Sequence, residues 1–161
     1  MDLKLRPANP DDERLLWEWV NDPLVRSSAL QSGSIEWESH RLWFRRRLDD
    51  AECLILIAEI SDCIPVGQVR FEWNSDGEAV VDISVDEKFR GLGFGSKILA
   101  MSVQALFNQS NALNANAYIK TDNIGSINTF KRAGFTRMET TELEGIRAEH
   151  YILSRSDEDR L

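Results

Sequence analysis

The chain has 161 residues, which suits one domain with a buried hydrophobic core. Hydrophobic residues make up 42% and charged residues 29%, proportions that are ordinary for a globular cytosolic protein. The formal net charge of -8, with no basic stripe to offset it, argues against nucleic acid as a partner but leaves room for a local anion-binding cluster.

The N-terminal segment lacks the apolar core of a signal peptide, and no apolar run reaches membrane-spanning length. We therefore expect a cytoplasmic protein with no membrane partner. Residues 3–5 alternate in polarity and predict a short first strand. A first helix should follow, with Asn9 as its N-cap and Pro10 at its first position, ending at residues 21–23. Its apolar face comprises Leu15, Leu16, Trp19 and Val20.

A second helix is expected over about residues 35–48, after a polar stretch whose last residue, Ser34, is the predicted cap. Three arginines at 45–47 suit the negative end of its dipole. Both helices are rich in tryptophan, with Trp17, Trp19, Trp37 and Trp43.

Three strands joined by short turns should come next and form an antiparallel meander over residues 54–60, 66–73 and 79–85. Cys53 and Cys63 flank its first hairpin; a disulfide is conceivable, but two free thiols suit a reducing compartment better. No metal site is predicted, because neither of the two histidines lies near a cysteine at ligand spacing.

Helices and strands then alternate, over residues 95–107 (helix), 115–119 (strand), 126–133 (helix closed by Gly134), 135–140 (strand) and 150–153 (strand). The order β-α-α-β-β-β-α-β-α-β-β predicts a mixed α/β (α+β) fold, with a mostly antiparallel twisted sheet flanked by helices. We expect one domain over residues 1–153 and a charged tail over 154–161.

A glycine-rich loop lies between the third meander strand and the next helix. Glycines at that point let several backbone amides converge, and the helix dipole adds a positive field, which together suit a phosphate group. The spacing Gly91-x-Gly93-x-Gly95 is not the Gly-x-Gly-x-x-Gly of dinucleotide-binding folds, and no Gly-Lys-Ser/Thr follows. The competing interpretation is a tight turn that binds nothing.

Arg90, Gly93 and Gly95 match the Arg/Gln-x-x-Gly-x-Gly/Ala signature of the GNAT acetyltransferases, which this chain resembles. The resemblance extends to residues 81–86, where the family has a bulged fourth strand. It also extends to residues 123–135, where an Asn begins a turn and a helix ends in Gly-Phe.

The resemblance implies acetyl-CoA as the cofactor. The amides from Gly91 to Ser96 should hold its pyrophosphate, main-chain groups of the preceding strand should pair with the pantetheine arm, and Asn123 should bind the far side of that arm. The implied cofactor-binding residues are Ile83, Ser84, Val85, Arg90, Gly91, Leu92, Gly93, Phe94, Gly95, Ser96, Asn123, Ser126, Phe130 and Lys131.

Acetyl transfer needs an unprotonated amine, a polarised thioester carbonyl and a proton for the departing thiolate. By resemblance, the N–H of Val85 polarises the carbonyl. Phe130 stands where many family members have a tyrosine that protonates the thiolate, so water, another side chain or nothing fills that role. The candidate bases are Glu72, Glu78, Asp82 and His40, each of which has a structural alternative as solvated surface or a half-buried ring.

The acceptor should be a small-molecule amine chosen by the first two helices. Residues 19–26 and the later His40 and Trp43 resemble a subgroup that acetylates nucleotide-linked amino sugars, as in pseudaminic acid pathways. Arg26 would then bind the diphosphate and Trp43 a ring, although Trp43 could instead pack the helices onto the sheet. The alternatives are a polyamine or peptide N-terminus attracted by the net negative charge, or a non-catalytic acyl-CoA-binding module. The sequence leaves monomer and homodimer open.

Overall fold

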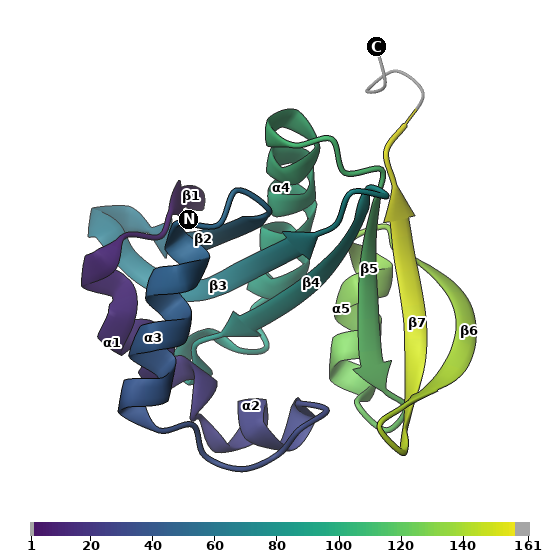
Figure 1. Cartoon of the computed structure of the whole chain (residues 1–161), viewed down its shortest axis with the longest axis horizontal. Helices are drawn as coiled ribbons and strands as arrows, with labels where there is room; N and C mark the ends of the chain where they lie inside the picture. The colour runs from purple at the N-terminus through teal and green to yellow at the C-terminus, as the bar shows by residue number, and fades with distance from the viewer. Residues whose placement is uncertain (1, 157–161) are drawn as a thin grey trace.

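The computed structural model describes residues 2–156, which form one seven-stranded sheet with helices on both faces (Figure 1). The strand order is β1-β2-β3-β4-β5-β7-β6, and β4–β5 is the parallel pair among antiparallel neighbours. The strands are β1 (Lys4–Pro7), β2 (Cys53–Ile60), β3 (Ile64–Trp73), β4 (Glu78–Val85), β5 (Asn114–Lys120), β6 (Thr136–Leu143) and β7 (Ile146–Ser154). The predicted fold class is confirmed.

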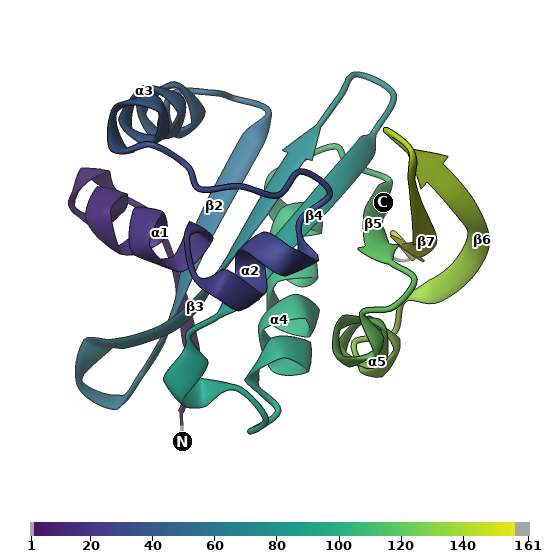
Figure 2. The same cartoon turned by 90° about the horizontal axis from the view of Figure 1, so that it is seen from below.

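Helices α1, α2 and α3 lie on one face of the sheet, whereas α4 lies on the other with α5 beside it (Figure 2). The helices are α1 (Glu13–Val20), α2 (Pro23–Ser28), α3 (Trp37–Leu48), α4 (Phe94–Gln109) and α5 (Ile124–Arg132). None of the helices in the described part of the chain is long and apolar enough to cross a membrane.

The first helix begins as the sequence predicts. The Asn9 side chain accepts a hydrogen bond from the Asp11 amide at 2.9 Å, and the Asp12 carboxylate accepts one from the Asn9 amide at 2.8 Å, which completes a capping box. Pro10 follows the cap and opens a 3-10 turn that leads into α1. Arg6 pairs with the buried Asp12 at 2.8 Å and so ties β1 to this turn.

Helix α2 is absent from the predicted order. Residues 21–23 do end α1, but Asp22 at once caps a new helix by accepting hydrogen bonds from the amides of Leu24 at 3.0 Å and Val25 at 3.3 Å. Pro23 is tolerated because the first helical position needs no N–H donor. The same residues therefore stop one helix and start another. The predicted cap of the next helix is also wrong, because α3 begins at Trp37 with Glu36 as its N-cap.

Two hydrophobic clusters hold the layers together. The larger one packs α4 and α5 against the sheet, and its fully buried members include Phe71, Ile98 and Leu99. The smaller one packs α1 and α3 against β2 through Leu16, Trp19, Phe44, Ile55 and Ile57. Cys53 and Cys63 are both free thiols.

The last strand extends one residue past the predicted domain end at 153. Ser154 belongs to β7, and the Arg155 guanidinium donates to the carbonyls of Ala112 and Ser110, each at 2.8 Å. The same guanidinium lies 4.9 Å from the Phe107 ring centroid. The rest of the expected charged tail, residues 157–161, lies outside the described residues.

Candidate active site

Strands β4 and β5 pair over three residues and then diverge. The parallel register runs from Glu78↔Asn114 to Val80↔Asn116, after which the two strands separate (Figure 1). Residues 81–85 of β4 and 117–119 of β5 line opposite walls of a cleft of about 980 Å³. The divergence of the strands creates this opening. The expected bulge in β4 is wrong, because the β3–β4 register is continuous from Gly67↔Val85 to Trp73↔Ala79.

The cleft gathers most of the residues that the sequence predicts for the cofactor. Leu92 and Lys131 do not line it, and the Leu92 side chain points into solvent with 61% of the residue exposed. The predicted cofactor residues that line it are Ile83, Ser84, Val85, Arg90, Gly91, Gly93, Phe94, Gly95, Ser96, Asn123, Ser126 and Phe130.

The glycine loop leaves open space where a ligand would lie. Gly91 and Gly93 have φ values of +76° and +85°, and a Cβ on either would meet no atom within 4 Å. These conformations favour glycine, so the loop holds its shape at little cost. Gly93 is the N-cap of the 16-residue α4 and has no side chain with which to cap the first amides. Those amides and the helix dipole are therefore available to an anion.

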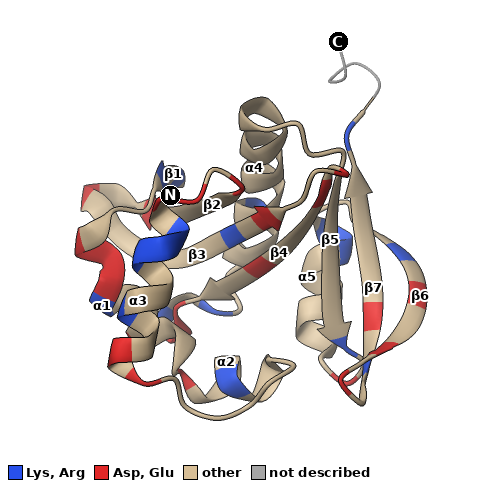
Figure 3. Ribbon diagram, viewed as in Figure 1, with Lys and Arg blue, Asp and Glu red and all other residues tan. Residues whose placement is uncertain are grey.

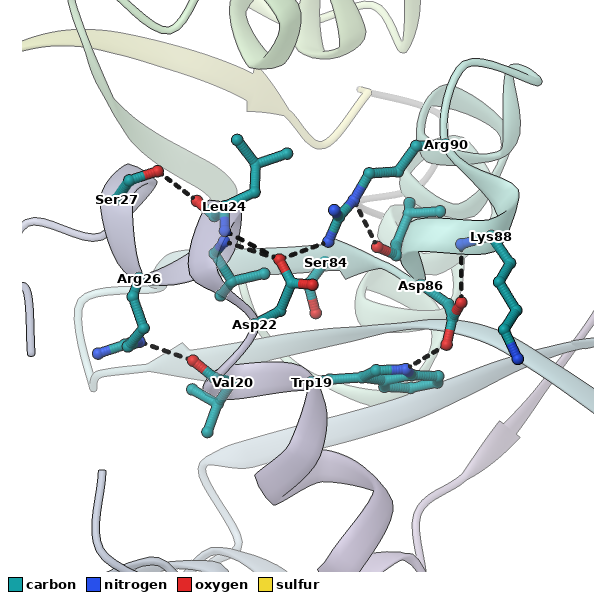
Figure 4. A network of polar contacts seen from close by, with 12 residues as sticks. Trp19, Val20, Asp22, Leu24, Arg26, Ser27, Ser84, Asp86, Lys88 and Arg90 are labelled. Carbon is teal, nitrogen blue, oxygen red and sulfur yellow. Dashed lines mark hydrogen bonds and ion pairs between the residues drawn. The ribbon is translucent and has the colours of Figure 1, made fainter. Parts of the chain in front are cut away.

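Arg90 does not project toward that anion site. Its Nε donates to the Val85 carbonyl at 3.1 Å and its Nη2 to the Asp22 carboxylate at 2.9 Å (Figure 4). Burial raises the pKa of Asp22, but the hydrogen bonds from Arg90 and from the amides of Val25 and Leu24 outweigh it, and the pKa lies below its usual value. Arg90 therefore fixes the loop against β4 and α2.

The other half of the cleft lies on the sheet face beneath α1 to α3. There the Gln68 amide donates to the Asp82 carboxylate at 3.0 Å and to the Ser84 hydroxyl at 3.1 Å. The Arg70 guanidinium stacks over the Trp43 ring of α3 at 4.8 Å. Tyr118 shares this face with Lys120, two residues further along β5, whose amine donates to a carbonyl in α2. The cleft thus has a backbone-lined loop at one end and a polar, aromatic chamber at the other.

A family model described as the acetyltransferase (GNAT) domain matches residues 2–136, which is most of the chain. The chain belongs to the GNAT acetyltransferase family. It is accordingly an N-acetyltransferase domain of the type that uses acetyl-CoA, as the sequence predicts.

One relative matches most of this chain in sequence. An uncharacterized protein of Methanocaldococcus jannaschii is 27% identical over 135 residues, which cover 83% of this chain but 28% of that protein. The chain therefore spans less than a third of the length of this relative.

Solved structures show the same fold at low identity. A spermidine N-acetyltransferase from Vibrio cholerae in complex with CoA and spermine has a TM-score of 0.86 at 15% identity, covering 94% of this chain and 95% of that one. An aminoglycoside acetyltransferase in complex with coenzyme A has a TM-score of 0.81 at 18% identity, covering 96% and 95% of the two chains. A domain from Methanocaldococcus jannaschii has a TM-score of 0.80 at 21% identity, covering 96% and 99%.

Two of the predicted bases of this GNAT domain lie outside the cleft. Glu72 pairs with Arg47 at 2.8 Å, and the Glu78 carboxylate accepts hydrogen bonds from the side-chain amides of Asn114 at 2.6 Å and Asn116 at 2.7 Å. Both lie toward the β3–β4 hairpin, at the opposite end of β4 from the glycine loop, and their carboxylates are already engaged. Neither is placed to receive a proton from an acceptor amine.

His40 and Asp82, the other candidate bases, do line the cleft. His40 is buried, stacks against Phe44 and donates from Nε2 to the Glu13 carbonyl at 2.8 Å. Burial lowers the pKa of His40 despite that hydrogen bond, so the ring is neutral at neutral pH and one nitrogen is committed. The Asp82 side chain is 55% exposed and faces the open space, which makes Asp82 the better-placed base.

The two predicted acceptor residues line the cleft with different roles. Arg26 donates from Nε to the Val20 carbonyl at 2.6 Å and from Nη1 to the carbonyls of Gly33 at 3.2 Å and Gln31 at 3.4 Å. Its guanidinium therefore holds the chain around α2, which argues against the expected contact with a diphosphate. Trp43 presents its ring to Arg70.

Sequence reasoning missed several residues of the cleft of this GNAT domain, namely Gln68, Arg70, Tyr118, Thr129 and Arg132. Strand alternation within β3 was the available signal, because it places Gln68 and Arg70 on one face. Strand alternation does not show which face of β3 borders the cleft. The position of the cleft depends on the divergence of β4 from β5, which the sequence of β3 does not contain.

Proposed function

We propose that this domain transfers the acetyl group of acetyl-CoA to the primary amine of a small acceptor that also carries an anionic group, with a nucleotide-linked amino sugar as the best candidate. One observation carries this proposal. Among the described residues that line the cleft, Asp82 is the one carboxylate, whereas four arginines line it, Arg26, Arg70, Arg90 and Arg132. Asp22 offsets the charge of Arg90 through an ion pair at 2.9 Å, which leaves three arginines against one carboxylate. The cleft thus reverses the sign of a chain whose formal net charge is -8.

Acidic positions elsewhere support that contrast. In Figure 3 they are prominent on α1 and on the β6–β7 hairpin, while basic positions on α2 and β3 lie near acidic positions on β3 and β4. A general acidic surface repels anions at long range, so a basic cleft favours an anionic ligand by local contacts.

The glycine loop would bind the pyrophosphate of CoA through the amides from Gly91 to Ser96. The pantetheine arm would run along β4, beyond the point where β5 leaves it, and pair with main-chain groups of Ile83 and Val85. The Val85 N–H would then polarise the thioester carbonyl for direct attack by the amine in a ternary complex.

Arg70 is the residue best suited to an anionic group on the acceptor. Its ion pairs with Glu72 and Asp82 are long, at 3.5 and 3.9 Å. A phosphate at hydrogen-bonding distance would be a closer partner and could form paired N–H···O bonds. Trp43 and Tyr118 both line the cleft and offer aromatic surfaces for a sugar or base ring.

The spermidine N-acetyltransferase that shares this fold is in complex with spermine, a polycation. A polyamine would meet one carboxylate and several arginines in this cleft, so we favour the anionic acceptor. The overall negative charge nevertheless assists encounter with a cation, which keeps this class in the test.

The test is CoA thiol release measured with saturating acetyl-CoA and four acceptor classes: nucleotide-linked amino sugars, spermidine, an aminoglycoside and N-terminal peptides. We expect the highest kcat/KM for a nucleotide-linked amino sugar. A higher value for spermidine would overturn the anionic acceptor. CoA binding by calorimetry without turnover of any amine would instead favour a non-catalytic acyl-CoA-binding module.

A further inference from the structure

Asp82 and Tyr118 occupy equivalent positions on the two strands that border the cleft. The last β4–β5 pair is Val80↔Asn116, and these two residues come two positions later on each strand. Side chains two apart on a strand project from the same face, so both project beneath α1 to α3 at the point where the strands diverge. Both line the cleft.

The surroundings of Tyr118 keep its phenol in place and protonated. Its ring stacks on His150, with centroids 4.7 Å apart and planes 14° from parallel. His150 is itself held between the Glu139 carboxylate at 3.0 Å and the Asn116 side-chain oxygen at 2.7 Å. Burial raises the pKa of Tyr118, and the charges of Glu139 and Glu78 raise it further. The hydroxyl is therefore protonated at neutral pH.

Asp82 faces Tyr118 from the opposite strand with an oriented carboxylate. Gln68 donates to one of its oxygens at 3.0 Å, and Arg70 lies 3.9 Å from the same oxygen. The Asp82 side chain remains 55% exposed, so a second ligand can reach it.

Phe130 leaves a role unfilled in the same cleft. Its ring is 3% exposed and packs edge-on against Phe135 at 5.0 Å. A phenyl ring has no proton to give, so Phe130 cannot protonate the thiolate.

We infer that Tyr118 protonates the departing CoA thiolate and that Asp82, facing it across the divergence of β4 and β5, takes the proton shed by the acceptor nitrogen. The inference rests on the proposed acetyl transfer. The neutral amine attacks the thioester carbonyl, the N–C bond forms, and the C–S bond breaks with its electron pair on sulfur. The nitrogen loses its proton to Asp82 and the sulfur gains one from Tyr118. The proton on Asp82 then returns to the phenolate through water, which restores both groups and leaves the amide and CoA thiol.

The test compares Tyr118→Phe with the parent protein at saturating acetyl-CoA and the best acceptor of the panel. We expect kcat to fall roughly 100-fold or more, the usual scale for a lost proton donor, with the CoA dissociation constant within about twofold. Tyr151→Phe is the matched control, because Tyr151 is the other tyrosine of the chain and lies buried in the core, outside the cleft. Its kcat should stay near that of the parent.

A kcat for Tyr118→Phe within about threefold of the parent would overturn the inference while leaving the proposed acetyl transfer intact. A parent protein that releases no thiol with any amine would overturn both. If Tyr118→Phe folds poorly, Asp82→Asn provides the second measurement, since Asp82 is exposed enough to tolerate the change. It should lower kcat/KM roughly 100-fold or more, the usual scale for a lost proton-transfer group. A kcat/KM within about threefold of the parent would overturn the assignment of the base.

Discussion

The Asp22 carboxylate joins the two halves of the cleft. Its Oδ1 accepts the amide hydrogens that begin α2, at Leu24 and Val25, and also the Arg90 Nη2 hydrogen at the start of the glycine loop (Figure 4). A second link runs in parallel, since Trp19 of α1 donates to the Asp86 carboxylate at 2.9 Å. Helices α1 and α2, which border the polar, aromatic half of the cleft, are therefore linked to the loop that would bind the pyrophosphate.

The first prediction tests that link. Asp22→Asn removes the ion pair with Arg90 but leaves an oxygen to cap α2, so folding should be retained with a loss of about 1 kcal/mol. The KM values for acetyl-CoA and for the acceptor should both rise a few-fold, because the loop and α2 lose their shared anchor. Steady-state kinetics with each substrate varied would measure this. The control is Asp11→Asn, an exposed carboxylate near the start of α1. A rise confined to one substrate would contradict the coupling.

The second prediction concerns the glycine loop. Gly93→Glu places bulk and negative charge in the open space beside the α4 N-terminus, so acetyl-CoA should no longer raise the melting temperature. Gly145→Glu is the matched control. Gly145, in the β6–β7 turn, has a similar φ of +79° and equally open surroundings, so it carries the same backbone strain and the same charge. Normal CoA binding by a folded Gly93→Glu variant would refute the loop assignment.

Much of the fold can be predicted because its signals are local. Asn9 and Pro10 mark the start of the first helix, the short turns mark the β2–β4 meander, and the glycine spacing marks the loop that we propose binds the cofactor. The sequence does not predict helix α2 because Asp22 and Pro23 both follow the end of α1 and begin α2.

The chemistry of the cleft depends on contacts that sequence does not display. From the sequence alone, the Arg26 side chain could be available to bind an anion. In the structure its guanidinium donates to backbone carbonyls of Val20 and Gly33. Glu78 is close in sequence to residues that line the cleft. Its carboxylate, however, accepts hydrogen bonds from Asn114 and Asn116 of β5, which are 36 and 38 positions later in the chain. Tyr118 becomes a candidate through the parallel register of β4 and β5, a non-local pairing.

The third prediction is a pH dependence of stability. Because the pKa of His40 in the folded chain lies below its ordinary value of 6.5, the unfolded chain binds a proton that the folded chain does not as pH falls below about 6.5. The free energy of unfolding should therefore decrease as the pH falls from 6.5 to the pKa of His40 in the folded chain. Below that pKa, His40 should cause no further decrease. The slope contributed is at most about 1.4 kcal/mol per pH unit.

Urea unfolding of His40→Gln between pH 7.5 and 5 measures that slope. Glutamine keeps an N–H donor for the Glu13 carbonyl but does not titrate, so the decrease should flatten. A parent slope that survives in His40→Gln would show that other groups control the acid sensitivity.

The fourth prediction separates the two arginines on the acceptor side of the cleft. Arg70→Gln removes the cation that stacks on Trp43 and faces the chamber, and a charge-assisted contact to an anionic acceptor is worth roughly 1.5–3 kcal/mol. The acceptor KM should rise about 10- to 100-fold, since each 1.4 kcal/mol is tenfold. The KM for acetyl-CoA should change little, because the glycine loop binds it elsewhere.

Arg26→Gln should instead lower the melting temperature by loosening α2, with a smaller effect on the acceptor KM. If Arg26→Gln raises the acceptor KM more than Arg70→Gln does, Arg26 is the anion-binding residue after all. If Arg70→Gln lowers the KM for spermidine and leaves that for the amino-sugar nucleotide unchanged, the acceptor is a cation.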